Sequence, residues 1–190
     1  MNQKEKMKKE FLEELDGYFM NFVYLKDMIQ VEEHISGLQQ VNELAPNFNL
    51  IVQCALIDSY MLSFMKLYDK SKQAKTIPGL IEKSKGYVKD FRKPDGAIEK
   101  LEEFEEKLKN DEDIVSAINT LRVRRDKYFV HNDDKYFGTK IENDETYLPK
   151  YKIWFLRDFT EEVLSYLWEQ LSDEKHREVK YNKDLENLCK

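Results

Sequence analysis

Residue types that suit phosphate chemistry stand close together in the second half of the chain. The segment reads Arg122-Val-Arg-Arg-Asp-Lys-Tyr-Phe-Val-His131-Asn-Asp. Imidazole has a reference pKa of about 6.5, so a histidine here could take or give a proton near neutral pH. A guanidinium offers a planar fork of N–H groups that can hold a phosphate as negative charge builds up on it. Together they suit acid–base chemistry at a phosphate group.

The helix expected to carry this segment changes character along its length. It should begin near Glu112 and bear an aliphatic stripe that ends at Leu121. In the last two turns the same stripe consists of Arg, Tyr and His side chains. Two interpretations remain open. These side chains face a polar pocket, because an unpaired buried charge is costly, or the helix end emerges into solvent, where basic residues are favourable in a last turn anyway.

The spacing leaves open which arginine works with the histidine. Six residues of helix would separate Arg125 from His131 by about 9 Å of rise and about 120° of rotation. These two side chains converge only if the helix ends near Phe129, or if a second chain completes the site. Arg124, seven residues before His131, would lie on nearly the same helix face. Periodicity alone therefore favours Arg124.

The segment resembles the Arg-x(4–6)-His motif of the HEPN superfamily, the higher eukaryotes and prokaryotes nucleotide-binding domains. From Arg125 through His131 to Asp133 it is especially similar to the U-type abortive-infection branch of that superfamily. The segment Leu62 to Asp69, at the end of an apolar helix, is similar to the same branch. The likeness covers the four main predicted helices, roughly residues 5–172.

The resemblance implies a metal-independent endoribonuclease, a hydrolase of RNA, that serves as a toxin or as an anti-phage, abortive-infection effector. In this family pattern Arg125 would hold the phosphate, and His131 would act as the base or as the acid for the leaving group. The resemblance thus favours Arg125 over Arg124 as the working arginine. The other candidates have supporting roles: Asp126 or Asn132 orients His131, Tyr128 positions the substrate, and Arg124 adds a phosphate contact.

The resemblance also implies partners. RNA is the expected ligand, and a homodimer would let two motifs meet across its interface. A cognate antitoxin protein would restrain a toxin, and no cofactor is expected. Two alternatives stay open: a catalytically silent HEPN-like module that binds RNA or protein through the same groove, and a helical dimerisation protein without this chemistry.

Helical periodicity dominates the chain that must position these residues. With 6 Gly and 4 Pro in 190 residues, the chain is too poor in turn residues for a β-sandwich. We predict an all-α fold, a HEPN-like up-and-down four-helix bundle with additional short helices. It forms a single domain over residues 1–190, with a core at about 5–172 and a charged C-terminal tail at 173–190. Long helices are expected at about 3–36, 47–70, 112–131 and 152–172, and shorter ones at about 77–87 and 97–109.

The second long segment is apolar around much of its girth. Leu50 and Cys54 begin one stripe, and Ile51 and Ala55 lie on a second apolar face beside it. A helix of this kind is expected at the centre of a bundle. Asp58 interrupts it, either as a buried partner for the arginine of the motif or as a side chain that points outward at the bundle edge.

The net charge of −6 argues weakly against a nucleic-acid partner, but the charges are unevenly placed. Residues 99–113 hold eight acidic and three basic residues. Residues 66–93 hold nine basic and three acidic residues, and the segment from Arg122 to Lys127 is basic again. An acidic protein with this distribution could still present a basic cleft to RNA, and what the stretch 66–93 contacts stays open.

The remaining signals point to a reduced, cytoplasmic protein. Cys54 and Cys189 do not suggest a disulfide framework. The N-terminus lacks the apolar stretch of a signal peptide, and the longest apolar run, residues 49–57, falls short of the ~20 residues that cross a bilayer. No membrane contact is therefore expected. His34 and His176 are expected at the surface, and no cluster has the spacing of a metal site.

Overall fold

The computed structural model describes residues 3–71, 74–126 and 147–174, and in these residues it contains helices and no strand. The predicted all-α architecture is thus confirmed. The elements are α1 (Gln3–Gly37), α2 (Gln39–Leu44), α3 (Pro46–Leu67), α4 (Ile77–Lys85), a 3-10 turn (Val88–Asp90), α5 (Ala97–Asn110), α6 (Glu112–Arg124) and α7 (Lys150–Leu171).

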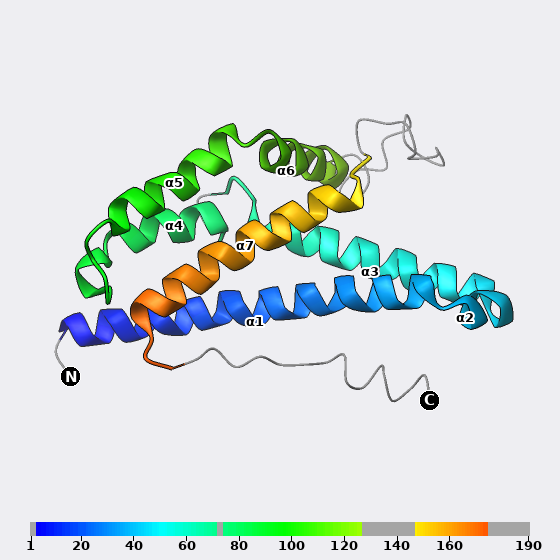
Figure 1. Cartoon of the computed structure of the whole chain (residues 1–190), viewed down its shortest axis with the longest axis horizontal. Coiled ribbons are helices and arrows are strands. Elements are labelled where there is room, and N and C mark those ends of the chain that lie inside the picture. Colours follow the sequence, from blue (N-terminus) through cyan, green and yellow to red (C-terminus); the bar gives the residue numbers. More distant parts are fainter. Residues whose placement is uncertain (1–2, 72–73, 127–146, 175–190) are drawn as a thin grey trace.

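The long helices form a layered bundle (Figure 1). α1 runs the length of the molecule, and α2 turns the chain so that α3 returns beside α1. α7 packs against both α1 and α6, and α6 also packs against α3 and α5. This arrangement brings the end of α6, where the candidate motif begins, against α3.

Local sequence signals fix where the later helices begin. The Asp111 carboxylate accepts hydrogen bonds from the N–H groups of Asp113 and Ile114, both at 3.1 Å, and so caps the start of α6. The Thr76 hydroxyl accepts from the N–H of Gly79 at the start of α4, 3.2 Å away. Gly96 precedes α5 with a φ of 76°, a backbone conformation that favours glycine. These local contacts set the first turns of α4, α5 and α6.

The core is aromatic and aliphatic and reaches every one of the long helices. Phe104 of α5 is fully buried and packs edge-to-face against Phe159 and Tyr166 of α7, with ring centroids 6.1 and 5.6 Å apart. Tyr68, just after α3, is also buried, and its hydroxyl lies 2.7 Å from the Thr160 hydroxyl of α7. This buried polar contact fixes the C-terminal end of α3 against α7.

One packing prediction is wrong in part. The second half of α3 is buried as expected, but its first half is exposed: Leu50 is 61% and Ile51 is 67% exposed, and Cys54 and Ala55 are exposed as well. The physical reason is that α1 and α3 extend beyond the other helices, so that, among the described elements, α1 and α2 lie beside the start of α3 (Figure 1). Among the described residues, α3 is also the helix that is long and apolar enough to cross a membrane by length and composition alone.

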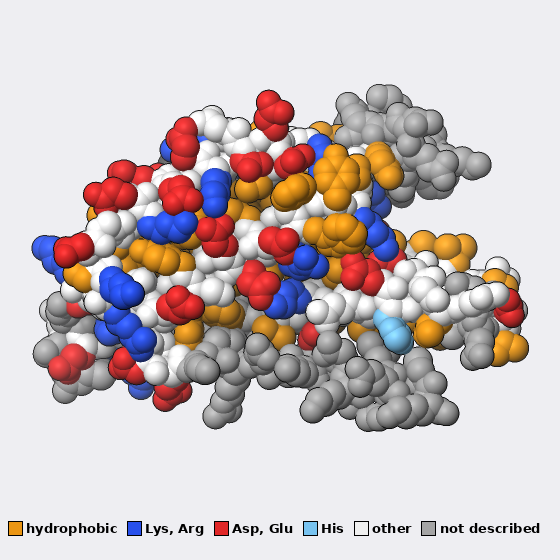
Figure 2. All heavy atoms as spheres, in the orientation of Figure 1, with side chains coloured by type: hydrophobic (Ala, Val, Ile, Leu, Met, Phe, Trp, Pro, Cys, Tyr) orange, Lys and Arg blue, Asp and Glu red, His pale blue; other side chains and the backbone are white. Residues whose placement is uncertain are grey.

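The surface mixes charges closely. Figure 2 shows acidic and basic side chains interleaved over α5 and the middle of α7, with hydrophobic side chains gathered at the N-terminal end of α7. Lys100 and Lys107 of α5 both pair with Glu162 of α7, at 3.1 and 3.0 Å. The acidic α5 is thus tied to α7 by its lysines and to α4 by Glu105, which pairs with Lys85 at 2.7 Å, whereas Glu99, Glu102 and Glu106 are exposed.

Candidate functional site

The candidate site lies where the C-terminal end of α6 meets the C-terminal end of α3. α6 ends at Arg124, and the chain widens into a π turn at residues 125 and 126. Such turns rotate the side chains that follow out of the α-helical register and are frequent at functional sites. Arg124 and Arg125 face different surroundings, because successive residues of a helix point about 100° apart.

Arg124 continues the buried stripe of α6. It is 9% exposed, and its Nη2 lies 3.8 Å from Oδ1 of Asp58 on α3. Asp58 is half-exposed, so both interpretations of this residue hold in part: it lies at the edge of the bundle and it faces an arginine of the motif. Burial raises the pKa of Asp58, and the charge of Arg124 opposes that rise. The position suits a structural role for Arg124.

Arg125 points instead to a partly open surface. Its Nε donates to Oδ1 of Asp126 at 2.8 Å, and its Nη1 donates to Oδ1 of Asp69 at 3.2 Å. The hydrogen bond to Asp126, followed by the charges of Asp126 and Asp69, raises the pKa of Arg125 against the opposing effect of burial. About a third of the Arg125 side chain is exposed, so the guanidinium is oriented by two carboxylates and is still accessible to a ligand.

A second arginine stands beside the first. Arg122 donates from Nη2 to the main-chain oxygen of Tyr68 at 3.2 Å and from Nη1 to Asn119 at 3.3 Å. Burial, and after it the positive charge of Arg125, lowers the pKa of Arg122. The two guanidiniums are therefore close enough to repel each other, with Asp69 as the acid that contributes to both. An anion such as a phosphate would relieve this repulsion.

Asp69 is the acidic centre of the site. Burial works against its ionisation, but the N–H groups of Lys70 and Ser71 and the Arg125 guanidinium together outweigh it and lower the pKa of Asp69. Sequence reasoning gave this residue no role, although it ends the Leu62 to Asp69 segment quoted for the family resemblance. Nothing in that segment alone indicates an arginine 56 positions later as its partner.

The described residues contain part of the predicted site. Arg124, Arg125 and Asp126 lie at the end of α6, whereas Tyr128, His131 and Asn132 fall outside the described residues. The structure therefore brings Arg125 together with Asp126 and Asp69, and it separates Arg124 from them. Within the described ranges, no group of three or more His, Cys, Asp or Glu side chains could hold a metal ion.

The contact between Arg125 and Asp69 predicts a measurable titration. A lowered folded-state pKa means that Asp69 stabilises the fold above the pKa of an unfolded Asp, about 3.9, and that this contribution is lost as the pH falls through the folded-state value. In Arg125→Ala one cause of the lowering is gone, so the titration midpoint of the Asp69 carboxyl should move upward. Carbon-13 NMR of that carboxyl measures it, and the signal that is missing in Asp69→Asn assigns it. An unchanged midpoint would mean that the two groups do not interact in solution.

Comparison with known proteins gives one match. The family model HEPN_AbiU2, described as AbiU2, matches residues 9–190 of the chain, which is nearly its whole length. The match includes α1 to α7 and the segment from Arg125 to His131. No curated protein and no solved structure matches the chain.

Proposed function

Because the chain belongs to the AbiU2 family of HEPN-type abortive-infection proteins, we propose that it is a metal-independent endoribonuclease that acts as a toxin or anti-phage effector. The observation that carries the proposal is the orientation of Arg125. This guanidinium is held by Asp69 and Asp126, is partly open to solvent, and begins the short segment that leads to His131. A cation that is fixed before the substrate arrives can stabilise a phosphate in the transition state without reorganisation.

The proposed reaction is transesterification followed by release of the leaving strand. His131 takes the proton of the ribose 2′-OH, and the O2′ atom attacks the adjacent phosphorus while the bond from phosphorus to the 5′ oxygen breaks. The departing 5′ oxygen receives a proton, and the other product carries a 2′,3′-cyclic phosphate. Arg125 binds the phosphate oxygens as their charge increases, and Arg122 adds positive potential beside it. Asp126 was expected to orient His131, but in the structure it accepts a hydrogen bond from Arg125, so we assign it the orientation of that guanidinium.

The proposal includes a homodimer. The exposed first half of α3 displays Phe48, Leu50 and Ile51, which are 61–67% exposed, in a run without a charged side chain from Pro46 to Ile57. A twofold contact places a patch opposite its own copy, so a patch of one charge sign would repel itself and an uncharged apolar patch does not. Light scattering tests this assembly, and a monomer at micromolar concentration would contradict it.

The cleavage proposal is tested with purified protein and a long single-stranded RNA in the presence of EDTA. We expect internal cuts, and we expect the products to carry 2′,3′-cyclic phosphates, which mass spectrometry identifies. Pretreatment of the RNA to 2′-O-methylate the ribose should block cutting, because the nucleophile is then absent. Intact RNA after incubation would contradict the proposal. Intact RNA that is nevertheless bound would favour the alternative of a catalytically silent RNA-binding module.

A further inference from the structure

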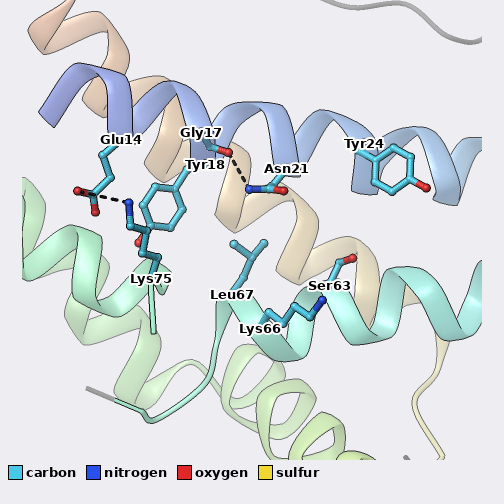
Figure 3. A pocket seen from close by; sticks show the side chains of 9 residues that line it. All are labelled: Glu14, Gly17, Tyr18, Asn21, Tyr24, Ser63, Lys66, Leu67 and Lys75. Atoms are coloured by element: carbon cyan, nitrogen blue, oxygen red, sulfur yellow. Dashed lines mark hydrogen bonds and ion pairs between the residues drawn. The ribbon is translucent and has the colours of Figure 1, made fainter. Parts of the chain in front are cut away.

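A cavity of about 310 Å³ lies between α1, the last turn of α3 and the segment that leads into α4 (Figure 3). This volume is at the lower end of the range for small-molecule sites, about 300–1,000 Å³. It is lined by Glu14, Gly17, Tyr18, Asn21, Tyr24, Ser63, Lys66, Leu67 and Lys75. The cavity is distinct from the arginine site, but Lys66 and Leu67 directly precede Tyr68 and Asp69, which Arg122 and Arg125 contact.

The lining combines positive charge with an exposed aromatic ring. Lys66 and Lys75 belong to the basic stretch 66–93. The single lining carboxylate, Glu14, is countered by Lys83 at 2.6 Å and by Lys75 at 4.0 Å, so three ammonium groups stand against one carboxylate. The Tyr24 side chain is 61% exposed and stands at the end of the cavity away from Lys75 (Figure 3).

Polar groups on the floor of the cavity are oriented by the helices. The Asn21 amide donates from Nδ2 to the main-chain oxygen of Gly17 at 2.9 Å, and its Oδ1 accepts no hydrogen bond from the other residues drawn around the cavity (Figure 3). The Tyr18 hydroxyl donates to the main-chain oxygen of Thr76 at 3.2 Å and ties α1 to the start of α4. These groups suit the parts of a nucleotide. The Asn21 amide can hydrogen-bond to an exocyclic amine of the base, the Tyr24 ring can stack on the base, and the ammonium groups can bind the phosphate.

Gly17 lines the cavity and has no side chain that would fill it. It lies inside the 35-residue helix α1, where glycine costs about 1 kcal/mol relative to alanine. A Cβ placed at Gly17 would meet no atom within 4 Å, so packing inside the chain does not require the glycine. A larger side chain at this position would instead occupy space beside the cavity.

We propose that this cavity binds one nucleotide of an RNA strand, with the base stacked on Tyr24 and a phosphate between Lys66 and Lys75. This inference rests on the proposed function, because it names a second contact of the same RNA. In this proposal, Lys66 and Lys75, at the beginning of the basic stretch 66–93, bind RNA.

The experiment compares Gly17→Leu with Gly17→Ala in a His131→Ala background, so that RNA binding is measured without cleavage. Both changes replace a helix-interior glycine, so both variants should melt at or above the temperature of the parent. Fluorescence anisotropy with a 12-nucleotide single-stranded RNA should show about tenfold weaker binding for Gly17→Leu and for Tyr24→Ala, the loss expected for one base–aromatic stack. Gly17→Ala should bind as the parent does. Equal affinity of the two Gly17 variants would overturn the proposal.

The phosphate contact has its own readout. Lys66→Gln should lower the slope of log Kd against log salt by about 0.7, the value for one phosphate on a single strand. Lys89→Gln, an exposed lysine of the same basic stretch that does not line the cavity, should leave the slope unchanged. If both variants change the slope alike, the effect is general attraction and the specific site is refuted.

Two further outcomes separate this inference from the proposed function. If the wild type cuts RNA but Gly17→Leu binds it as tightly as Gly17→Ala, the cavity assignment fails and the nuclease stands. If no RNA is cut but Gly17→Leu weakens binding tenfold, the cavity assignment stands and the nuclease fails. A titration with 5′-AMP, monitored by NMR, tests whether the cavity binds a free nucleotide and not an RNA strand. Binding of 5′-AMP that Gly17→Leu abolishes, with unchanged RNA affinity, would overturn the assignment to RNA.

Discussion

Arg125→Ala is expected to remove RNA cleavage and keep the fold, and Arg124→Ala is expected to weaken the fold. Arg125 is a third exposed and pairs with Asp69 and Asp126, which are themselves partly exposed. Exposed ion pairs contribute about 0–1 kcal/mol, so its loss should hardly change the free energy of unfolding. A fixed donor to a charged transition state contributes much more to the rate, and we expect a decrease of about 10²–10³-fold. His131→Ala should lower the rate by about 10²–10⁴-fold.

For Arg124 we expect a large effect on stability and a small effect on cleavage. It is 9% exposed, and its long side chain packs between α6 and α3 beside Asp58. Truncation to alanine removes that packing and leaves the carboxylate of Asp58 with less compensation, for which we expect a loss of about 2 kcal/mol in unfolding free energy. Cleavage by the folded fraction should stay within a few-fold of the wild type. Urea denaturation and single-turnover cleavage at a temperature where both variants are folded measure the two effects separately.

Arg125→Lys is the matched control, because it keeps the charge and loses the planar fork. We expect it to bind RNA as the wild type does and to cleave it slowly, since lysine cannot make two parallel hydrogen bonds to one phosphate. If Arg124→Ala loses cleavage as completely as Arg125→Ala while remaining folded, the assignment of Arg125 as the working arginine is wrong.

The helices were predictable because their apolar residues repeat with the period of a helix. The first long helix, expected at about 3–36, is α1 at Gln3–Gly37, and the last, expected at about 152–172, is α7 at Lys150–Leu171. The start of α6, expected near Glu112, is also confirmed, and the Asp111 carboxylate caps it. The sequence did not predict α2 (Gln39–Leu44), because six residues are too few to show a periodic apolar stripe.

Packing was less predictable, since periodicity shows that a face is apolar and does not show what covers it. Leu50 and Cys54 continue the same stripe as Phe64, yet only Phe64 is buried within the chain. The difference depends on where α6 packs against α3, which is a long-range property. The uncovered half of the stripe is the surface that the proposed dimer uses.

The candidate site, like the packing of the helices, was predictable from the sequence only in part. Regular helical spacing places Arg124 in line with Leu121, and the structure agrees, with both residues buried. The next residue points about 100° away from Arg124, and spacing could not show that Asp69 of the segment after α3 lies there as the partner of Arg125. The family resemblance selected Arg125 because it compares function-bearing positions and does not depend on helix geometry. The Asp69 contact was missed because the two residues are 56 positions apart.

Lys150→Met is expected to destabilise the protein by about 3 kcal/mol, one of the largest effects of a substitution at a half-exposed position. Glu32 of α1 is 2% exposed, and both of its carboxylate oxygens accept hydrogen bonds from Nζ of Lys150, at 3.0 and 2.7 Å. Removal of one partner from a buried ion pair leaves an uncompensated charge, which typically costs 3–5 kcal/mol. Lys150 is 47% exposed in its side chain, so some water can reach the pair and the lower end applies.

This pair joins α1 to the first residue of α7, so its loss should free the start of α7 from the bundle. For a chain of this length, about 3 kcal/mol corresponds to a decrease in Tm of roughly 6–12 °C, which calorimetry resolves. Lys152→Met is the matched control: Lys152 lies in the same turn of α7 but donates to the neutral Ser116 hydroxyl at 2.6 Å, so less than 1 kcal/mol should be lost. The double variant Glu32→Gln with Lys150→Met should recover part of the stability, because no buried charge then remains. A Tm of Lys150→Met equal to that of Lys152→Met would show that Glu32 is compensated without Lys150.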